Sequence, residues 1–303
     1  MPLPRATVEA LRGREVDFAE DAPLLKKTWW RAGGPADGFA IAHDLRTLCA
    51  LQQVAFETDC PIFALGNASN LLVADAGIRG LVVRLGGALA ADEERVDGVV
   101  HLGAGLKLMP LMSRMQRQGW TGLEFFAGIP GTVGGAVRMN AGTTLGETVD
   151  ALLDVEVVMP DGSIRAVSAA DLNMSYRTAH LPAGAIIASA RFQTSGSDPE
   201  ASQAQIQKHL AHRARTQPVD VPTCGSTFRN PPGDHAGRLI EASGLKGFRI
   251  GAAEVSTKHA NFLVNTGGAT AADIRRLVDH VRDVVEGDHG VRLVQEVHFV
   301  GDW

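Results

Sequence analysis

A glycine-rich stretch at residues 123–147, LEFFAGIPGTVGGAVRMNAGTTLGE, constrains the fold of this chain more than any other part of the sequence. It opens with an apolar run and continues with closely spaced loop-forming residues, namely Gly128, Pro130, Gly131, Gly134 and Gly135. Glycine adopts positive φ angles and lets a backbone approach a ligand without a Cβ atom in the way, while proline fixes one φ angle. A loop of this kind directs several N–H groups into one small volume, which suits phosphate oxygens. A cluster of tight turns between strands is the alternative interpretation.

The stretch does not match the familiar phosphate-binding motifs. No lysine follows the glycines, so it is not the P-loop GxxxxGK[ST]. Gly103-Ala104-Gly105 reads GxG, but Leu108 stands where a dinucleotide fingerprint has its third glycine. A dinucleotide bound by this chain is therefore held outside the Rossmann scheme.

Length and composition exclude several classes of protein. A chain of 303 residues suggests two or three domains, and a net charge of −5 argues against a nucleic-acid surface. No apolar run approaches the ~20 residues of a membrane span, and residues 1–15 lack the apolar centre of a secretory signal. Cys49, Cys60 and Cys224 show no CxxC spacing, which favours reduced thiols in a cytosolic protein over a disulfide or zinc site. We therefore expect no metal.

The hydrophobic pattern alternates between the periods of strands and helices. Predicted strands lie at residues 36–42, 61–65, 71–73, 80–85, 99–105, 185–192, 260–265 and 292–300, with a hairpin at 155–167. Predicted helices lie at residues 45–54, 107–118, 200–215, 236–242 and 271–285. Asp44 caps the first helix, while Thr270 and Asp273 form a capping box for the last. The polar segment 195–199 (SGSDP) is the clearest boundary, and we predict domains at residues 1–85, 86–198 and 199–303.

Residues 66–70 (GNASN) form a second polar loop after a predicted strand. Its small side chains, amides and hydroxyl supply donors for anionic oxygens. Two such loops in successive parts of the chain would hold one diphosphate-bearing cofactor between them. The alternative is a pair of unrelated turns.

Two candidate catalytic side chains stand in short polar segments. Arg177 follows Tyr176, the only tyrosine of the chain. A guanidinium fork binds a carboxylate or phosphate with two hydrogen bonds, although a lone arginine is usually a surface residue. Ser226 lies in CGSTFRNP, which is not the GxSxG of a serine hydrolase. Its hydroxyl is either a proton donor or a group that satisfies its own turn.

Glu296 lies in the predicted strand 292–300, and alternation places it on the same face as Val294 and Val300. A carboxylic acid in partly buried surroundings has a raised pKa, so it can stay protonated and donate a hydrogen bond. The alternative is a solvent-facing glutamate on an edge strand.

Three histidines are candidate metal ligands or site residues. His209 and His212 lack the glutamate of HExxH, so we interpret them as solvated helix residues. His259 has polar neighbours on both sides, which is compatible with a site or with a surface.

Taken in order, these segments resemble the UDP-N-acetylenolpyruvoylglucosamine reductase family. The family motifs are GxGSNLLV, GxEFxxGIPGTVGGAVxMNAGxxGxE, YR, GSxFxNP, AGxLIExxGLKGxxxGxAxVSxKHANFxVN and a terminal E-V. This sequence carries them at residues 66–73, 122–147, 176–177, 225–231, 236–265 and 296–297. The resemblance covers almost the whole chain after about Thr28.

The resemblance implies an α+β protein with a two-subdomain FAD-binding fold of the PCMH/vanillyl-alcohol-oxidase type, followed by an α+β substrate-binding domain. It implies that residues 1–85 and 86–198 hold FAD non-covalently and that residues 199–303 bind the substrate. In the family, NADPH reduces the flavin and the flavin N5 then passes hydride to the enolpyruvyl group of UDP-N-acetylglucosamine enolpyruvate. The product is UDP-N-acetylmuramate, a peptidoglycan precursor.

The resemblance also implies roles for residues at matched positions. Ser226 is the expected proton donor, Arg177 the expected partner of the enolpyruvyl carboxylate, and Glu296 a stabiliser of the negative charge that hydride addition creates. The expected cofactor-binding residues are Gly66, Asn67, Ala68, Ser69, Asn70, Gly128, Ile129, Pro130, Gly131, Thr132, Gly134, Gly135, Ala136 and Asn140. The expected substrate-binding residues are Tyr176, Asn230, Lys246, His259 and Asn261.

The sequence departs from the family pattern at a few positions. Ala68 replaces the glycine of GxGSN, Arg138 stands where an aromatic residue often precedes MNAG, and Arg229 replaces a lysine. Since Tyr176 is the only tyrosine, the chain resembles the shorter type of the family, which lacks a tyrosine-bearing loop.

The expected partners are small molecules alone, without nucleic acid or membrane, and we expect a cytoplasmic monomer. Two other functions fit part of the pattern. One is another FAD oxidoreductase of the same fold, such as a hydroxyacid or sugar-lactone oxidase. The other is a non-catalytic UDP-sugar-binding module, which would be colourless.

Overall fold

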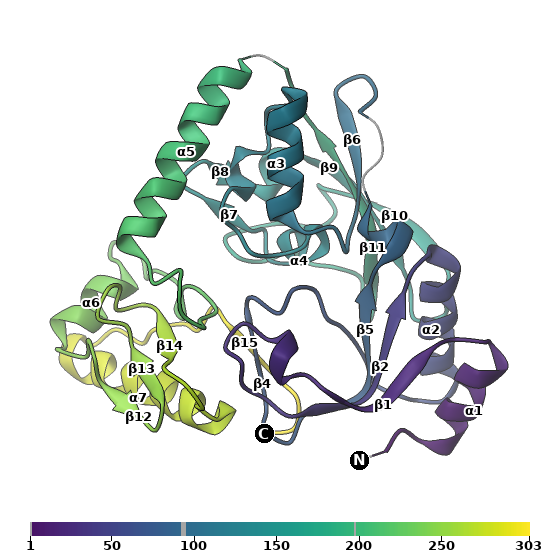
Figure 1. Cartoon of the computed structure of the whole chain (residues 1–303), viewed down its shortest axis with the longest axis horizontal. Helices are drawn as coiled ribbons and strands as arrows, with labels where there is room; N and C mark the ends of the chain where they lie inside the picture. The colour runs from purple at the N-terminus through teal and green to yellow at the C-terminus, as the bar shows by residue number, and fades with distance from the viewer. Residues whose placement is uncertain (1, 92–94, 197) are drawn as a thin grey trace. The chain divides into compact units, whose positions relative to one another are not determined.

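The computed structural model describes residues 2–91, 95–196 and 198–303, so Ser197 of the predicted boundary segment lies outside the described residues. The chain forms two units, each assembled from segments that are distant in the sequence (Figure 1). Unit 1 contains residues 1–21, 37–67 and 80–210, and unit 2 contains residues 22–36, 68–79 and 211–303. The predicted domain limits at residues 85 and 198 stay predictions.

The first sheet, most of whose residues belong to unit 1, has the strand order β1-β2-β5-β3. Its elements are α1 (Arg5–Gly13), β1 (Phe18–Pro23), β2 (Pro35–Ala42), α2 (Leu45–Glu57), β3 (Ile62–Ala64) and β5 (Ile78–Leu85), with short 3-10 turns η1 (Leu25–Lys27) and η2 (Gly87–Ala90). The carboxylate of Asp44 caps α2 by accepting the N–H of Thr47 at 2.7 Å, which confirms the predicted helix start. Leu48 and Leu51 of α2 are completely buried in one core with Leu81 of β5.

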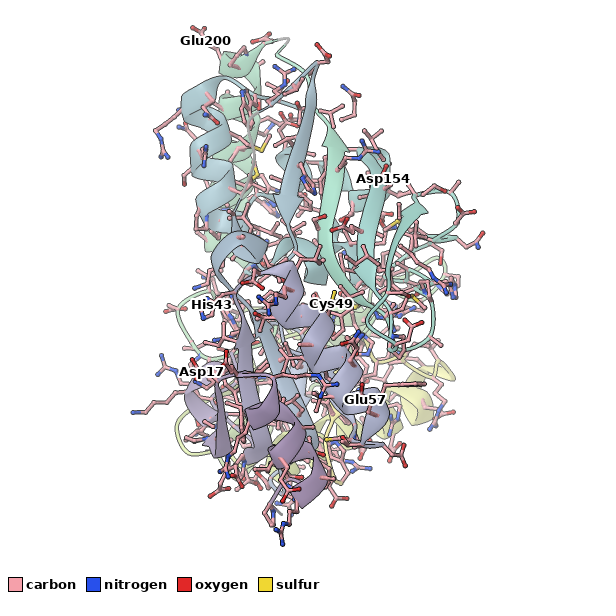
Figure 2. The ribbon with its side chains drawn as sticks, turned by 90° about the vertical axis from the view of Figure 1, so that its right-hand side faces the viewer. Asp17, His43, Cys49, Glu57, Asp154 and Glu200 are labelled. Carbon is pink, nitrogen blue, oxygen red and sulfur yellow. The ribbon has the colours of Figure 1, made fainter. Side chains whose placement is uncertain are left out.

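Helices α1 and α2 are joined mainly by apolar packing. Figure 2 shows Cys49 and Glu57 projecting from α2. Arg14, directly after α1, donates to Glu57 Oε2 at 2.6 Å. Because this ion pair is largely exposed, it contributes only about 0–1 kcal/mol to stability. Leu11 of α1, which is completely buried, holds the pair of helices more strongly.

The second sheet of unit 1 is antiparallel and has the order β10-β9-β11-β6. Its strands are β6 (Val99–Gly103), β9 (Leu152–Val158), β10 (Ile164–Ser168) and β11 (Ile186–Gln193). Unit 1 also contains the helix α3 (Leu108–Gln118) and the first twelve residues of α5 (Pro199–Thr216), whose last turn and a half belongs to unit 2. Strands β9 and β10 form the hairpin predicted around the Pro-Asp-Gly turn, where Gly162 takes a φ of 79°. The predicted helices at 107–118 and 200–215 and the predicted strand at 185–192 are confirmed.

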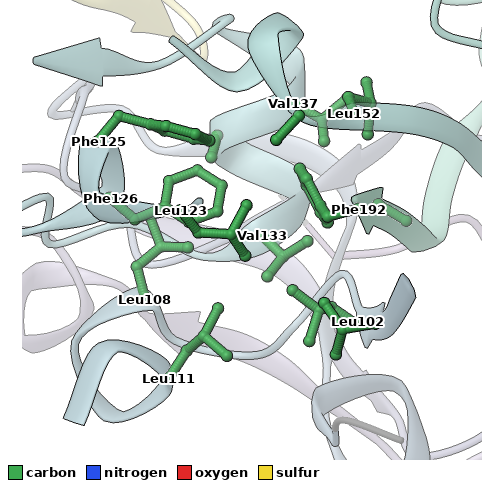
Figure 3. Packing of buried hydrophobic residues seen from close by; sticks show 14 of the residues in the cluster. Leu102, Leu108, Leu111, Leu123, Phe125, Phe126, Val133, Val137, Leu152 and Phe192 are labelled. Carbon is green, nitrogen blue, oxygen red and sulfur yellow. The ribbon is translucent and has the colours of Figure 1, made fainter. Parts of the chain in front are cut away.

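The glycine-rich stretch contains more regular structure than the sequence analysis expected. It folds into η3 (Glu124–Phe126), the short helix α4 (Val133–Arg138) and the two-residue strands β7 (Gly142–Thr143) and β8 (Gly146–Glu147), and η4 (Thr148–Asp150) follows it directly. Glycines raise the cost of a helix, which hid α4 from pattern reasoning. Burial of apolar side chains offsets that cost. Phe126, Val133 and Phe192 pack in one core (Figure 3), and the rings of Phe126 and Phe192 meet edge to face with their centroids 5.7 Å apart.

Unit 2 is built around the helix α7 and the antiparallel sheet β12-β13-β14. Its elements are β4 (Leu71–Val73), α6 (Ala236–Ala242), β12 (Arg249–Ile250), β13 (Ala253–Val255), β14 (Leu263–Asn265), α7 (Ala271–His289) and β15 (His298–Val300). Thr270 and Asp273 form the predicted capping box of α7. Asp75 also caps this helix, since its carboxylate accepts the N–H groups of Ala271 at 2.8 Å and Ala272 at 2.9 Å. Segment 68–79 is thereby fixed to the C-terminal part of the chain.

The predicted strand at 292–300 is wrong over most of its length. Only β15 is a strand, pairing in parallel with β4, whereas residues 291–297 form an irregular extended segment. Val294 is 60% exposed, so the alternation expected along this strand fails. Main-chain hydrogen bonds to the irregular segment at Thr227 and Arg229 replace the regular ladder.

Among residues 2–91, 95–196 and 198–303, no helix is long and apolar enough to span a membrane. The same residues contain no cluster of three or more His, Cys, Asp or Glu side chains that could hold a metal ion.

Candidate functional site

In unit 1, the first residues of the polar loop lie against the glycine-rich loop. The side-chain amide of Asn67 donates to the carbonyl of Pro130. A Cβ atom on Gly66 would lie 2.9 Å from Thr132 Oγ1, so only glycine allows this approach. These contacts support the prediction that the two loops form one surface.

The glycine-rich loop is held by its backbone and keeps two N–H groups available. Leu108 N donates to Gly131 O at 3.1 Å, and Gly134 N donates to Ala104 O at 2.8 Å. A Cβ atom on Gly134 would lie 2.9 Å from Ala104 Cβ, so this glycine is required for packing. Among the described residues, the N–H groups of Gly131 and Thr132 have no acceptor. Such N–H groups fit anionic oxygens.

Arg84 is a functional candidate that the sequence analysis missed. It is the residue before the last in β5, it is half-buried, and its Nε and Nη2 atoms lie 3.4 Å from Gly66 O. Burial lowers the pKa of this guanidinium, and no carboxylate of the described residues pairs with it. A desolvated cation without an anion is costly. The signal in the sequence was the single charge inside the apolar run LVVRL at residues 81–85.

These features fit the diphosphate of FAD. The donor set consists of main-chain N–H groups, the Asn67 amide and the Arg84 guanidinium, and Gly66 leaves room where a side chain would project. Arg84 adds positive charge that the glycine pattern alone did not predict.

The rest of the polar loop belongs to unit 2. Ala68 takes a φ of 51°, a conformation that the family glycine would adopt more easily. Its carbonyl lies 3.8 Å from the thiol of Cys224, and burial raises the pKa of this thiol to about 12. The Asn70 amide donates to Glu296 O at 3.2 Å. Cys224 is thus an inert packing residue.

Unit 2 brings Ser226 and Glu296 onto neighbouring segments. Ser226 forms a β-bridge with Phe262. On the other side of the same segment, Glu296 N donates to Thr227 O at 2.8 Å. Ser226 and Glu296 are both half-buried. The predicted proton donor and the predicted acid therefore share one backbone ladder, although Glu296 lies outside any regular strand.

Two asparagines predicted to bind substrate make structural hydrogen bonds. Asn261 is 3% exposed, and its amide bonds to both the N–H of Phe228 at 3.0 Å and the C=O of Phe228 at 2.8 Å. Asn230 Oδ1 accepts the N–H of Ala236 at 3.1 Å, at the start of α6. Their roles toward substrate stay predictions.

His259 lies beside the Ser226 ladder. Its ring packs on Phe262 at 4.8 Å, and its Nδ1 atom accepts the N–H of Asn261 at 3.3 Å. Burial, followed by the positive charge of Lys246, lowers the pKa of His259. Lys246 itself forms an ion pair with Glu241 at 2.6 Å. His259 is therefore favoured in its neutral form.

Arg177 and Tyr176 lie in unit 1, at the two central positions of a tight turn. Ser175 and Thr178 close this turn through two hydrogen bonds of 2.9 Å. The Arg177 guanidinium lies 4.9 Å from the centre of the Tyr176 ring, and its Nη2 atom donates to Gly142 O at 3.2 Å. Because Arg177 and Ser226 belong to different units, their convergence on one substrate stays a prediction.

The fold and these loops define a class, the FAD-binding flavoproteins. Residues 36–168 match the FAD binding domain family. Glucooligosaccharide oxidase from Acremonium strictum has a similar fold, with a TM-score of 0.50 and 16% identity over 98% of this chain and 66% of that chain. This likeness shows the fold alone, and it agrees with the predicted oxidase-type architecture.

Other comparisons identify the family. Residues 217–300 match the family described as UDP-N-acetylenolpyruvoylglucosamine reductase, C-terminal domain. A protein of that name from Alkalilimnicola ehrlichii is 49% identical over 92% of this chain and 93% of its own length. The solved structure of this reductase (MurB) from Thermus caldophilus has a TM-score of 0.82 and 36% identity, covering 94% of this chain and 98% of that chain. The chain belongs to the UDP-N-acetylenolpyruvoylglucosamine reductase family, as the sequence motifs predicted.

Proposed function

We propose that this protein reduces UDP-N-acetylglucosamine enolpyruvate to UDP-N-acetylmuramate, with NADPH as reductant and FAD as cofactor, in peptidoglycan precursor synthesis. The observation that carries the proposal is the 49% identity to a reductase of this name across 92% of the chain. The Asn67–Pro130 contact and the unpaired Gly131 and Thr132 N–H groups support FAD binding from the structure itself.

The residues act on the substrate in distinct ways. FAD, when bound, supplies the hydride that adds to the enolpyruvyl alkene. Arg177 binds the neighbouring carboxylate and stabilises the negative charge that develops there. Ser226 donates its hydroxyl proton to the carbon next to the site of hydride addition. Glu296 stabilises the developing charge from the segment paired with Thr227.

We assign the cofactor to residues 66–70 and 128–136, with Arg84 as an added charge. Tyr176, Lys246 and His259 are proposed substrate contacts, together with Asn230 and Asn261. Asn140, the remaining residue of the expected cofactor set, is completely buried. In this proposal residues 1–85 and 86–198 bind FAD, residues 199–303 bind substrate, and the protein is a cytoplasmic monomer.

The test is to purify the protein and record its absorbance spectrum, then to follow NADPH consumption with and without the enol ether. We expect a flavin spectrum and NADPH consumption that depends on the enol ether. A colourless protein that gains no flavin from added FAD would favour a binding module. Flavin that NADPH reduces and only O₂ reoxidises would favour an oxidase of the same fold.

A further inference from the structure

Asn140 is completely buried directly after α4, and its side chain makes three hydrogen bonds within the protein. Its Nδ2 group donates to Glu147 Oε2 at 2.9 Å and to Ser175 O at 3.1 Å. Its Oδ1 atom accepts the N–H of Val149 at 3.0 Å. Both donors of the amide are therefore used by protein acceptors. The role of this side chain therefore depends on the groups that it connects, the turn at Ser175 and the hairpin at Glu147.

The first of these groups is the turn that carries Arg177. Ser175 O, which accepts from Asn140, also accepts the N–H of Thr178 and so closes the turn. Arg177 takes a φ of 57° in this turn. Residues with a Cβ atom avoid this region, and such a conformation persists only where the surrounding structure enforces it. The Asn140 bond to Ser175 is one such constraint.

The second group is the small hairpin of β7 and β8. Glu147, which accepts from Asn140, pairs with Gly142 in this hairpin. Gly142 O in turn accepts from Arg177 Nη2 at 3.2 Å. A Cβ atom on Gly142 would lie 2.4 Å from Gly146 O, so the hairpin is closely packed. Asn140 thus fixes both the backbone of Arg177 and the carbonyl that orients its guanidinium.

Arg138, from the same helix end, holds the turn at a further point. Its Nη1 atom donates to Ala179 O at 2.7 Å, directly after the turn. This arginine is the residue that stands in place of the usual aromatic before MNAG. Its exposed position means that its loss leaves the core intact.

We propose that Asn140 is a positioning residue that sets Arg177 for the substrate carboxylate, and that Arg138 assists it. The proposal rests on the proposed function of Arg177. Asn140 does not touch the reacting atoms. It acts by holding the guanidinium where the carboxylate binds, since small displacements of a binding group cause large losses of rate.

The experiment measures three quantities in Asn140→Ala and Arg138→Met: FAD affinity, the rate of flavin reduction by NADPH, and kcat/KM for the enol ether. We expect Asn140→Ala to lower kcat/KM by about tenfold to a hundredfold, with FAD affinity and flavin reduction within about twofold of the wild type. Arg138→Met, which spares the core, should lower kcat/KM by about threefold to tenfold, the loss of one hydrogen bond. Arg138→Lys should restore much of it. Ser163→Ala, which removes a surface hydrogen bond to Asp161 in the same unit, is the matched control.

A double-mutant cycle with Arg177→Ala decides whether Asn140 acts through Arg177. We expect Asn140→Ala to have no further effect on kcat/KM in the Arg177→Ala background. Equal losses in both backgrounds, or a parallel loss of FAD affinity and flavin reduction, would overturn the positioning role. If Asn140→Ala does not fold, a cycle that combines Arg138→Met with Arg177→Ala replaces it, and kcat/KM is compared in the same way. Unchanged turnover in Arg177→Ala alone would instead remove Arg177 from the reaction, which is a failure of the proposed function and is visible before any cycle is built.

Discussion

The segment that carries Ser226 and the turn that carries Arg177 are held in place by different kinds of bond. Around Ser226 the main chain does the positioning: Thr227 N donates to Asn261 O, Glu296 N donates to Thr227 O, and Arg229 N donates to Val294 O, each at 2.8 Å. The turn of Arg177 instead depends on side chains, because the amide of Asn140 and the guanidinium of Arg138 hold its two ends.

This difference predicts how each region responds to substitution. A main-chain ladder survives the loss of most side chains, since every residue supplies the same N–H and C=O groups. A side-chain clamp is lost with one residue. Removal of the Ser226 hydroxyl should therefore change chemistry without changing structure, whereas the geometry of Arg177 is sensitive to residues that never contact the substrate.

The largest expected effect is that of Ser226→Ala on turnover. Loss of a positioned proton donor should lower kcat for the enol ether by about 10²–10⁴-fold. FAD affinity and flavin reduction by NADPH should stay unchanged, because the backbone bonds around Ser226 remain. Stopped-flow absorbance separates the two half-reactions.

Ser243→Ala provides the control for this variant. Ser243 lies in the same unit, and its hydroxyl lies 3.2 Å from His289 Nε2. We expect wild-type turnover from it. Turnover of the enol ether at the wild-type rate in Ser226→Ala would show that the proton comes from elsewhere.

The second effect concerns Asn261, whose side chain bonds both main-chain groups of Phe228 in the Ser226 ladder. Asn261→Ala leaves the N–H and the C=O of Phe228 without partners in a residue that is 1% exposed. Each unsatisfied buried group costs about 1–3 kcal/mol, so for two groups we expect the free energy of unfolding to fall by about 2–6 kcal/mol. Urea denaturation of the FAD-free protein measures it.

Asn230→Ala is the matched comparison, since this side chain satisfies one N–H group at the start of α6. Its loss should cost about 1 kcal/mol. If Asn261→Ala lowers the free energy of unfolding no more than Asn230→Ala does, the ladder is held by its main chain alone. The difference between the main-chain positioning of Ser226 and the side-chain positioning of Arg177 would then be larger.

Local signals in the sequence predicted the features that local physics determines. The Asp44 cap and the Thr270–Asp273 capping box are set within four residues, and both were predicted correctly. The motif residues of the two loops also came from short stretches. Their closeness in space, through the Asn67–Pro130 bond, followed from the idea of a shared cofactor rather than from any periodicity.

The failures have a common physical cause, which is pairing between distant segments. The strand-like composition around Glu296 predicts a regular strand, but the partner of this segment is the irregular segment at Thr227. The bond between Asn140 and Ser175, which spans 35 residues, is equally invisible in the sequence, while the role of Asn140 toward the cofactor stays a prediction. Hydrogen bonds of this kind leave no period in the sequence.

The smallest expected effect is a pH dependence of stability that arises from His259. Burial, and then the charge of Lys246, lower its pKa below the ordinary 6.5. Above pH 6.5 the ring is neutral in both folded and unfolded chains and adds no pH dependence. As the pH falls below 6.5, the unfolded chain binds a proton that the folded chain does not, so stability decreases until the folded pKa is reached. Asp44, whose pKa is lowered by hydrogen bonds from Thr47, loses its contribution to stability only at pH values below its ordinary 3.8.

Between pH 7 and pH 5, therefore, the wild type should lose more unfolding free energy than His259→Gln, as measured by urea denaturation at each pH. If the wild type and His259→Gln lose the same unfolding free energy between pH 7 and pH 5, the ring takes up its proton without disturbing the ladder at Phe262. The Ser226 region would then be less closely packed than the Arg177 turn.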